Sequence, residues 1–224
     1  MFRELFSAFS KETAIDRAFS ELNVMLEEGA WMFVRANDVL HGRVSADEAV
    51  GAIDERERKI NRLERSIRRK VLRHLTINPG HDVPVCLALV SVARDAERIG
   101  DYCKNVFEVG HCYDRGFHVP AYHDPLEKVS SETLEMFRMV GAACRDATRQ
   151  DEARKAKDRS GSIREQCDQV IEQLFREEHE IEFHEAVAYS LLARHYKRVA
   201  AHLTNIATAV LGEWSELDVD FDDA

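Results

Sequence analysis

Apolar residues recur every three or four positions in long stretches of this chain, which is the spacing that places them on one face of an α-helix. Polar and charged residues fill the positions between them, so each stretch has one face to bury and one to leave in water. Six stretches show the pattern: residues 12–42, 45–77, 82–110, 126–144, 163–175 and 186–210. The pattern predicts an all-α protein.

Residues that favour helix ends stand between these stretches. Ser45 and Glu48 have the spacing of a capping box, and Asp82 is placed to cap the third helix with its side chain. The triplet Asn-Pro-Gly at residues 78–80 stops the second stretch. The first three helices are therefore bounded by recognisable local signals.

The densest group of helix breakers in the chain lies between residues 110 and 125, with three helical stretches before it and three after it. Each amphipathic helix needs two neighbours to cover its apolar face, which predicts two tandem three-helix bundles. The expected units are a first bundle at residues 1–115, a second bundle at 116–215, and an acidic tail at 216–224. The first bundle is expected to include a short N-terminal helix that packs on it through Phe2, Leu5, Phe6 and Phe9.

Residues 92–106 and 192–206 are similar segments one hundred positions apart, which indicates a duplicated unit. Several further pairs keep apolar or small character. The identical pairs are Ala93 and Ala193, Arg94 and Arg194, Arg98 and Arg198, and Asn105 and Asn205. The two bundles are therefore expected to be related by an internal pseudo-symmetry, and the repeated polar residues are assigned to the scaffold.

The mismatches within the repeat are more informative than the matches. Glu97 in the first copy stands where the second has Lys197, and Asp101 stands where the second has Ala201. A function that needs these two carboxylates is therefore expected only in the first bundle.

Composition narrows the class of protein. The net charge of −10 argues against nonspecific nucleic-acid binding, and the five cysteines form no CxxC pair. No run of about 18 apolar residues and no secretory leader is visible, which predicts a cytoplasmic protein with reduced thiols. Residues 54–74 carry nine Lys and Arg against four acids. This basic segment is either a solvated helix face or a peripheral contact with anionic headgroups at the inner membrane face.

Glu97 and Asp101 lie one helical turn apart and project from the side opposite the core residue Ile99. Like charges at this spacing destabilise a helix by about 0.2–0.5 kcal/mol, so a purpose other than stability is indicated. Asp54 and Glu57, one turn apart on the preceding helix, are their expected partners if the two helices run antiparallel. Oxygen ligands of this kind would suit iron, manganese, magnesium or calcium.

The alternative for these acids is an ordinary solvated face in which Arg94, Arg98 and Lys104 neutralise them. Catalysis has less support. The chain shows no Ser/His/Asp or Cys/His arrangement and no glycine-rich phosphate loop, so no nucleophile can be nominated and a protein that is not an enzyme is expected.

The run Ala96-Glu97-Arg98-Ile99-Gly100-Asp101 late in the third helix resembles the ERIGD signature of the PhoU family of phosphate-uptake regulators. Residues 197–202 resemble a degenerate second copy, and residues 57–64 are similar to the family's second helix. The resemblance implies two tandem three-helix bundles, metal on acidic helix motifs, and a regulatory role at a phosphate transporter and its sensor kinase.

The chain departs from that family in its second half, where Lys197 and Ala201 replace the acids and the position matching Glu57 is expected near Ser160. The leading hypothesis is a cytoplasmic adaptor that docks on a transporter ATPase or a sensor kinase and binds metal on the first bundle alone. A carboxylate bundle that acts as a metal enzyme or storage protein, and an accessory subunit of another membrane transporter, are the alternatives. A homodimer stays open.

Overall fold

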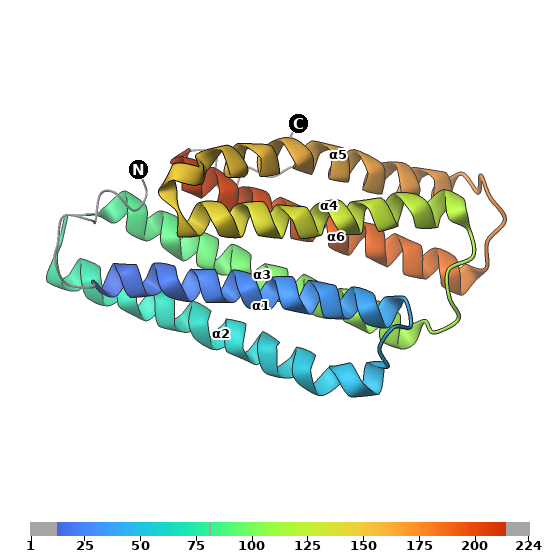
Figure 1. Ribbon diagram of the computed structural model, residues 1–224, viewed down its shortest axis with the longest axis horizontal. Coiled ribbons are helices and arrows are strands. Elements are labelled where there is room, and N and C mark those ends of the chain that lie inside the picture. Colours follow the sequence, from blue (N-terminus) through green and yellow to red (C-terminus); the bar gives the residue numbers. More distant parts are fainter. Residues whose placement is uncertain (1–12, 81, 214–224) are drawn as a thin grey trace.

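The computed structural model describes residues 13–80 and 82–213 of the chain. The described part contains six long helices, one short 3-10 helix and no strand (Figure 1), which confirms the all-α prediction. The predicted N-terminal helix at residues 2–9 and the acidic tail at 216–224 lie outside the described residues. The elements are α1 (Ala14–Leu40), α2 (Ala46–Ile77), α3 (Val83–Cys112), α4 (Pro120–Arg145), η1 (Ala147–Arg149), α5 (Gln150–Phe175) and α6 (Phe183–Leu211).

Helix α5 is a full three turns longer at its start than the apolar pattern predicts, because it begins at Gln150 rather than near residue 163. The inward positions of these extra turns carry small side chains, Ala153, Ala156 and Ser160, all buried. Alanine has the highest helix propensity but adds little to an apolar periodicity, so the pattern missed this part of the helix.

The capping residues agree with the sequence at α2 and differ at α3. The Ser45 hydroxyl accepts a hydrogen bond from the Glu48 N–H at 3.2 Å. The prediction for Asp82 was wrong, because its side chain makes no cap hydrogen bond. Asp82 has a left-handed backbone with φ of 61°, and its carboxylate lies 3.1 Å from His74 Nε2 at the end of α2. The side chain therefore links two helices instead of capping one.

The helices form two bundles that lie side by side along the long axis of the molecule (Figure 1). Helices α1, α2 and α3 pack against one another, and α4, α5 and α6 do the same. The repeat helices α3 and α6 start one hundred residues apart, pack against each other and run in opposite directions. Two tandem bundles with internal pseudo-symmetry are thus confirmed.

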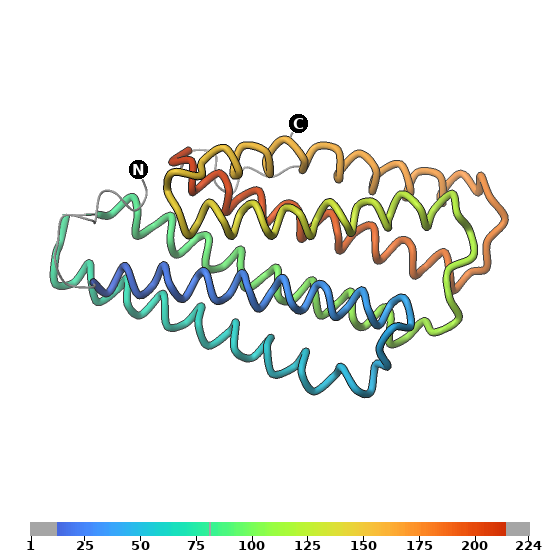
Figure 2. Tube along the Cα trace, in the orientation of Figure 1, coloured from blue at the N-terminus to red at the C-terminus, as the bar shows by residue number. Residues whose placement is uncertain are grey.

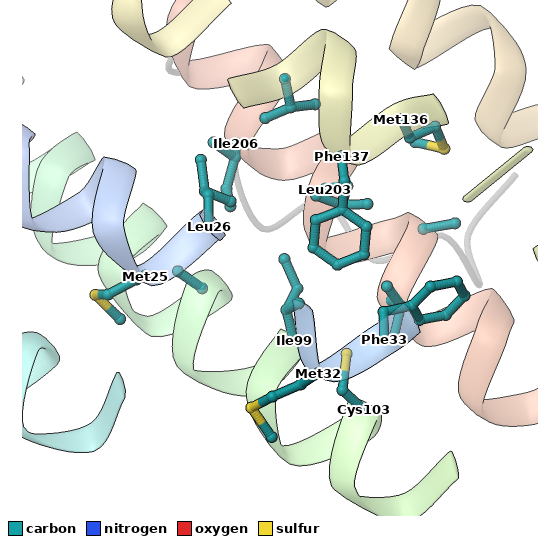
Figure 3. Packing of buried hydrophobic residues seen from close by; sticks show 14 of the residues in the cluster. Met25, Leu26, Met32, Phe33, Ile99, Cys103, Met136, Phe137, Leu203 and Ile206 are labelled. Carbon is teal, nitrogen blue, oxygen red and sulfur yellow. The ribbon is translucent and has the colours of Figure 1, made fainter. Parts of the chain in front are cut away.

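The two bundles share one apolar core. A single cluster of buried apolar side chains draws on all six long helices, and Figure 3 shows its central part. The ring of Phe33 on α1 has its centroid 5.7 Å from that of Phe137 on α4 and 5.5 Å from that of Tyr196 on α6. The halves therefore meet through aromatic packing of the kind found inside a domain.

A buried amide joins three helices inside this core. Asn37 on α1 accepts hydrogen bonds through Oδ1 from Ser130 Oγ on α4 at 2.9 Å and from the Tyr196 hydroxyl on α6 at 2.5 Å. Its Nδ2 donates to the Phe33 carbonyl at 2.7 Å. Because a buried amide must have its partners, this node fixes how the two bundles sit against each other.

A second polar contact lies where α3 meets α6. Asp95, only 4% exposed, accepts a hydrogen bond from Asn205 Nδ2 at 3.0 Å and lies 2.8 Å from His202 Nδ1. The Tyr102 ring stacks on that of His202 with centroids 5.7 Å apart. Asn205, one of the repeated residues, therefore contributes to the contact between bundles.

Residues 113–119 connect the bundles, and the expected break between residues 115 and 116 falls within this connection. The buried Glu185 carboxylate near the start of α6 accepts hydrogen bonds from the backbone N–H groups of His118 and Val119. The connection is thus held to the second bundle. Within the described ranges, no helix is long and apolar enough to cross a membrane.

Candidate metal and partner face

Helices α2 and α3 pack closely where α3 carries Gly100. A Cβ built on Gly100 would lie 3.0 Å from Ile60 Cδ1 of α2, tighter than ordinary van der Waals contact. The glycine lets the two backbones come together, and this brings the acids of α2 alongside those of α3. The Ile-Gly pair within the ERIGD run therefore has a packing role that positions the acids.

Glu97 and Asp101 lie on α3 beside its contact with α2, with 25% and 33% of their side chains exposed. Burial raises the pKa of Glu97 above its usual range, and the Asp101 charge adds to the rise. Burial also raises the pKa of Asp101; Arg98, 3.1 Å away, opposes this and the Glu57 charge adds to it. The acids thus form a partly buried like-charged group, rather than the fully exposed face that the sequence suggested.

Of the two predicted acids of α2, one lies near Asp101 and the other pairs with a base. Glu57 accepts a hydrogen bond from Asn61 Nδ2 at 2.5 Å, and its charge acts on Asp101 of α3. The Asn61 Oδ1 atom is buried without a hydrogen-bond partner. Asp54 instead forms an ion pair with Lys104 at 2.8 Å. The structure therefore places Glu57 near Asp101, while Arg98 pairs with both Glu97 and Asp101.

Glu64 is the acid that sequence reasoning did not place in this group. It is 9% exposed, forms an ion pair with Arg68 one turn further along α2, and its charge also raises the pKa of Glu97. The signal was visible in the sequence, because Glu64 stands between Ile60 and Ile67 on the buried line of α2. Because a buried carboxylate needs a partner, this inward position indicated that Glu64 contacts other charged or polar side chains.

In their present rotamers these carboxylates do not enclose an ion. Among the described residues, no three or more His, Cys, Asp or Glu side chains are gathered closely enough to hold a metal ion. The donor chemistry nevertheless suits a hard cation, because Glu57, Glu97 and Asp101 all offer carboxylate oxygens and Asn61 adds an unpartnered amide oxygen. Their side chains would have to rotate toward one another to hold one ion.

Comparison with known proteins gives the family. The PhoU domain profile matches residues 22–109 and again residues 126–210, which is most of the chain. This chain belongs to the PhoU family. It is 25% identical over 169 residues to the phosphate-specific transport system accessory protein PhoU homolog of Synechocystis sp., covering 70% of this chain and 71% of that protein.

Two solved PhoU structures share the fold. The PhoU crystal structure from Pseudomonas aeruginosa superposes with a TM-score of 0.75 at 20% identity, covering 88% of this chain and 95% of that one. The phosphate transport system regulatory protein PhoU from Streptococcus pneumoniae gives a TM-score of 0.69 at 20% identity, covering 92% and 100%. The PhoU architecture predicted from the ERIGD run is confirmed.

The second PhoU repeat replaces the acidic group with an ion pair. Lys197, at the position of Glu97, forms an ion pair with Asp168 of α5 at 2.8 Å, and Asp168 stands one hundred residues after Arg68. The signs of charge at these two positions are therefore exchanged between the bundles. Because Lys197 and Asp168 neutralise each other, this pair needs no further cation.

The expected counterpart of Glu57 lies near Ser160, which is buried on α5. Lys157, about one turn earlier, forms an ion pair with Glu213. Neither position carries an acid.

Proposed function

We propose that this chain regulates phosphate transport and phosphate signalling as a cytoplasmic adaptor without catalytic activity. The observation that carries the proposal is the match of the PhoU domain to both halves of the chain, together with the resemblance to an accessory protein of a phosphate-specific transport system. Its expected partners are the ATPase of a phosphate transporter, a sensor kinase, or both. Self-association as a homodimer is compatible with this role.

The proposal includes one metal-binding face, on the first bundle. Glu57, Glu97 and Asp101 would hold the ion, with Asn61 as a further oxygen donor and Asp54 joining only if it leaves Lys104. Iron, manganese, magnesium or calcium would suit these ligands. A bound cation would add to the neutralisation that Arg98 already gives Glu97 and Asp101, and the raised pKa of both acids is the physical reason to expect one.

The acidic group offers little for catalysis. Glu97 and Asp101 are partly exposed, while the interior of the bundles is filled by apolar side chains. A carboxylate enzyme or storage bundle needs four to six ligands that face a bundle core, and the core of the described residues does not provide them. An accessory role at another membrane transporter is the second candidate. The effect of deleting the gene on phosphate uptake distinguishes it from the proposed role in phosphate transport.

Deletion of the gene is expected to derepress phosphate uptake and phosphate-starvation genes in phosphate-rich medium. The reason is that an adaptor which restrains a transporter or kinase acts by binding, so its loss releases the restraint. Radiolabelled phosphate uptake and transcript levels are the measurements, with the wild-type gene restored as the control. Normal phosphate regulation in the deletion strain would refute the proposed function.

Metal, if held by this chain, is expected to disappear from the Glu97→Gln/Asp101→Asn variant. Both substitutions remove a ligand charge but keep side-chain size, and the relief of like-charge repulsion offsets the loss of the partly exposed Arg98 ion pairs, so the cost in stability is small. Elemental analysis of protein purified without chelators is the measurement, and Asp168→Asn in the second bundle is the matched control. Metal that survives the double substitution, or that is lost in the control, would place the site elsewhere.

A further inference from the structure

Five arginines form a straight stripe along the outer face of α2: Arg58, Arg62, Arg65, Arg69 and Arg73. Their spacings of three and four residues keep them within about 80° of the helix circumference, over a length of roughly 22 Å. The buried residues of α2, such as Ile60 and Ile67, lie on the opposite side. The stripe therefore points directly away from the core.

No carboxylate of the described residues forms an ion pair with any arginine of this stripe. The other bases of α2 are paired: Arg56 and Lys59 with Glu28, and Lys70 with Glu21. Only Arg58 and Arg65 use their Nε groups, and both donate to backbone carbonyls of their own helix. Five guanidinium charges are thus left for a ligand, in a protein whose net charge is −10.

The duplicated scaffold supplies an internal comparison. One hundred residues later in the sequence, α5 carries Asp158, Ser162, Glu165, Gln169 and Gln173. These side chains are equally polar but carry two negative charges and no positive one. Helix solubility alone is therefore satisfied without arginine, so the stripe is a feature added to the first bundle and not a requirement of the fold.

The position of α2 leaves the stripe accessible to a flat partner. Helix α2 packs on α1 and α3 and forms an outer edge of the molecule (Figure 2). At the end of the stripe, near the α2–α3 connection, three apolar side chains are exposed: Leu72 (68%), Ile77 (65%) and Leu87 (64%). The surface thus combines a row of unpaired cations with an apolar tip.

We propose that the arginine stripe binds the headgroups of an anionic phospholipid bilayer, with the apolar tip of Leu72, Ile77 and Leu87 entering the headgroup region. Guanidinium groups bind phosphate oxygens in a bidentate manner, and basic faces with apolar residues are the usual form of interfacial attachment. The inference rests on the proposed function, since it would place the regulator beside a membrane transporter.

A protein helix fits this surface less well than a bilayer does. Between Arg58 and Arg69 the outermost positions are all arginine, so a partner helix would find no apolar side chain to bury along most of the stripe. A plane of phosphates needs no apolar side chain, and each basic residue near such a surface contributes independently to the free energy of binding. Nucleic acid carries a similar negative charge, so the test below compares binding to duplex DNA with binding to anionic vesicles.

The full-length protein is expected to sediment with vesicles of phosphatidylglycerol and phosphatidylcholine in equal parts, and not with vesicles of phosphatidylcholine alone. Arg62→Gln/Arg65→Gln/Arg69→Gln should weaken partitioning roughly 100-fold, which corresponds to about 1 kcal/mol for each charge. The matched control is Arg94→Gln/Arg138→Gln/Arg194→Gln, which changes the net charge equally at exposed arginines outside the stripe. Far-UV circular dichroism checks that both variants remain helical.

The variant Leu72→Ser/Ile77→Ser/Leu87→Ser should also bind the anionic vesicles more weakly, while its binding keeps the same salt dependence. Equal binding by the stripe variant and the wild type, equal binding to neutral vesicles, or tighter binding to duplex DNA than to anionic vesicles at the same salt would each overturn the inference. These results are independent of the deletion phenotype. A protein that regulates phosphate uptake but ignores lipid would refute the inference and leave the proposed function standing.

Discussion

Separate expression of residues 1–115 and 116–224 is expected to give two chains that lack cooperative unfolding, whereas the intact chain unfolds in one transition. The reason is the shared core, in which side chains of one bundle are buried by those of the other. Gly29 of α1 shows how close this packing is, because a Cβ there would lie 3.2 Å from Ile99 Cγ2 and 3.5 Å from Phe137 Cε1.

The free energy lost when the bundles are separated decides whether either half can fold alone. Separation would expose apolar side chains from both bundles at the junction, at about 1.5–3 kcal/mol for each large one. The residues concerned include Leu26, Phe33, Phe137, Tyr196, Leu203 and Ile206. Their sum, about 10 kcal/mol or more, matches the whole stability of a typical domain, about 5–15 kcal/mol. Two bundles in sequence are therefore expected to be one unit in folding.

Urea titration followed by near-UV circular dichroism measures this directly, because that signal reports fixed aromatic packing. Mixing the two halves should restore part of the signal. Intact protein cleaved in the connection at residues 113–119 after folding is the control, since it has the same cut but keeps the assembled core. A cooperative transition in either isolated half would show that the bundles are independent domains.

Helix positions could be predicted from the sequence because periodicity is a local property. Stretches with large apolar residues every three or four positions were located well, and the start of α5 was missed where the inward residues are alanine and serine. The break between bundles was equally local, because prolines and glycines act on their own neighbours. Family membership followed from six consecutive residues at a defined place in a helix.

Contacts between distant parts of the chain could not be predicted in this way. Asn37 meets Ser130 and Tyr196, which lie 93 and 159 residues away, and only the tertiary packing brings them together. Asp95 has no partner on its own helix face and finds two of them on α6. A buried polar residue in an apolar stripe indicates that a partner exists, but it does not identify that partner.

The acidic group of α2 and α3 combines a local contact, which can be predicted from the sequence, with contacts between helices, which cannot. The pairing of Glu97 with Asp101 is local, since the residues are one turn apart. Which acids of α2 join them depends on the register of two helices, and that register is set by the contact of Gly100 with Ile60. The charge of Glu57 acts on Asp101, whereas Asp54, one turn earlier, lies beside Lys104.

Replacing Phe33 by alanine is expected to lower the free energy of unfolding by about 3–5 kcal/mol, the usual cost of deleting a buried aromatic ring. Phe33 is 1% exposed and packs against Phe137 and Tyr196, so the cavity would open where both bundles meet. The loss of two tilted aromatic pairs adds to the loss of buried area.

Neighbouring side chains cannot easily fill that cavity, because hydrogen bonds hold α1 in place here. The Asn37 side chain donates to the Phe33 carbonyl and accepts hydrogen bonds from Ser130 of α4 and Tyr196 of α6. Urea unfolding curves measure the effect, and Phe175→Ala is the matched control, because Phe175 is 85% exposed and should change stability by less than about 0.5 kcal/mol. Phe33→Leu should fall between the two, since it keeps most of the buried volume. If Phe33→Ala proved as mild as Phe175→Ala, the junction would be loosely packed, and the single folding unit inferred from the shared core would fail with it.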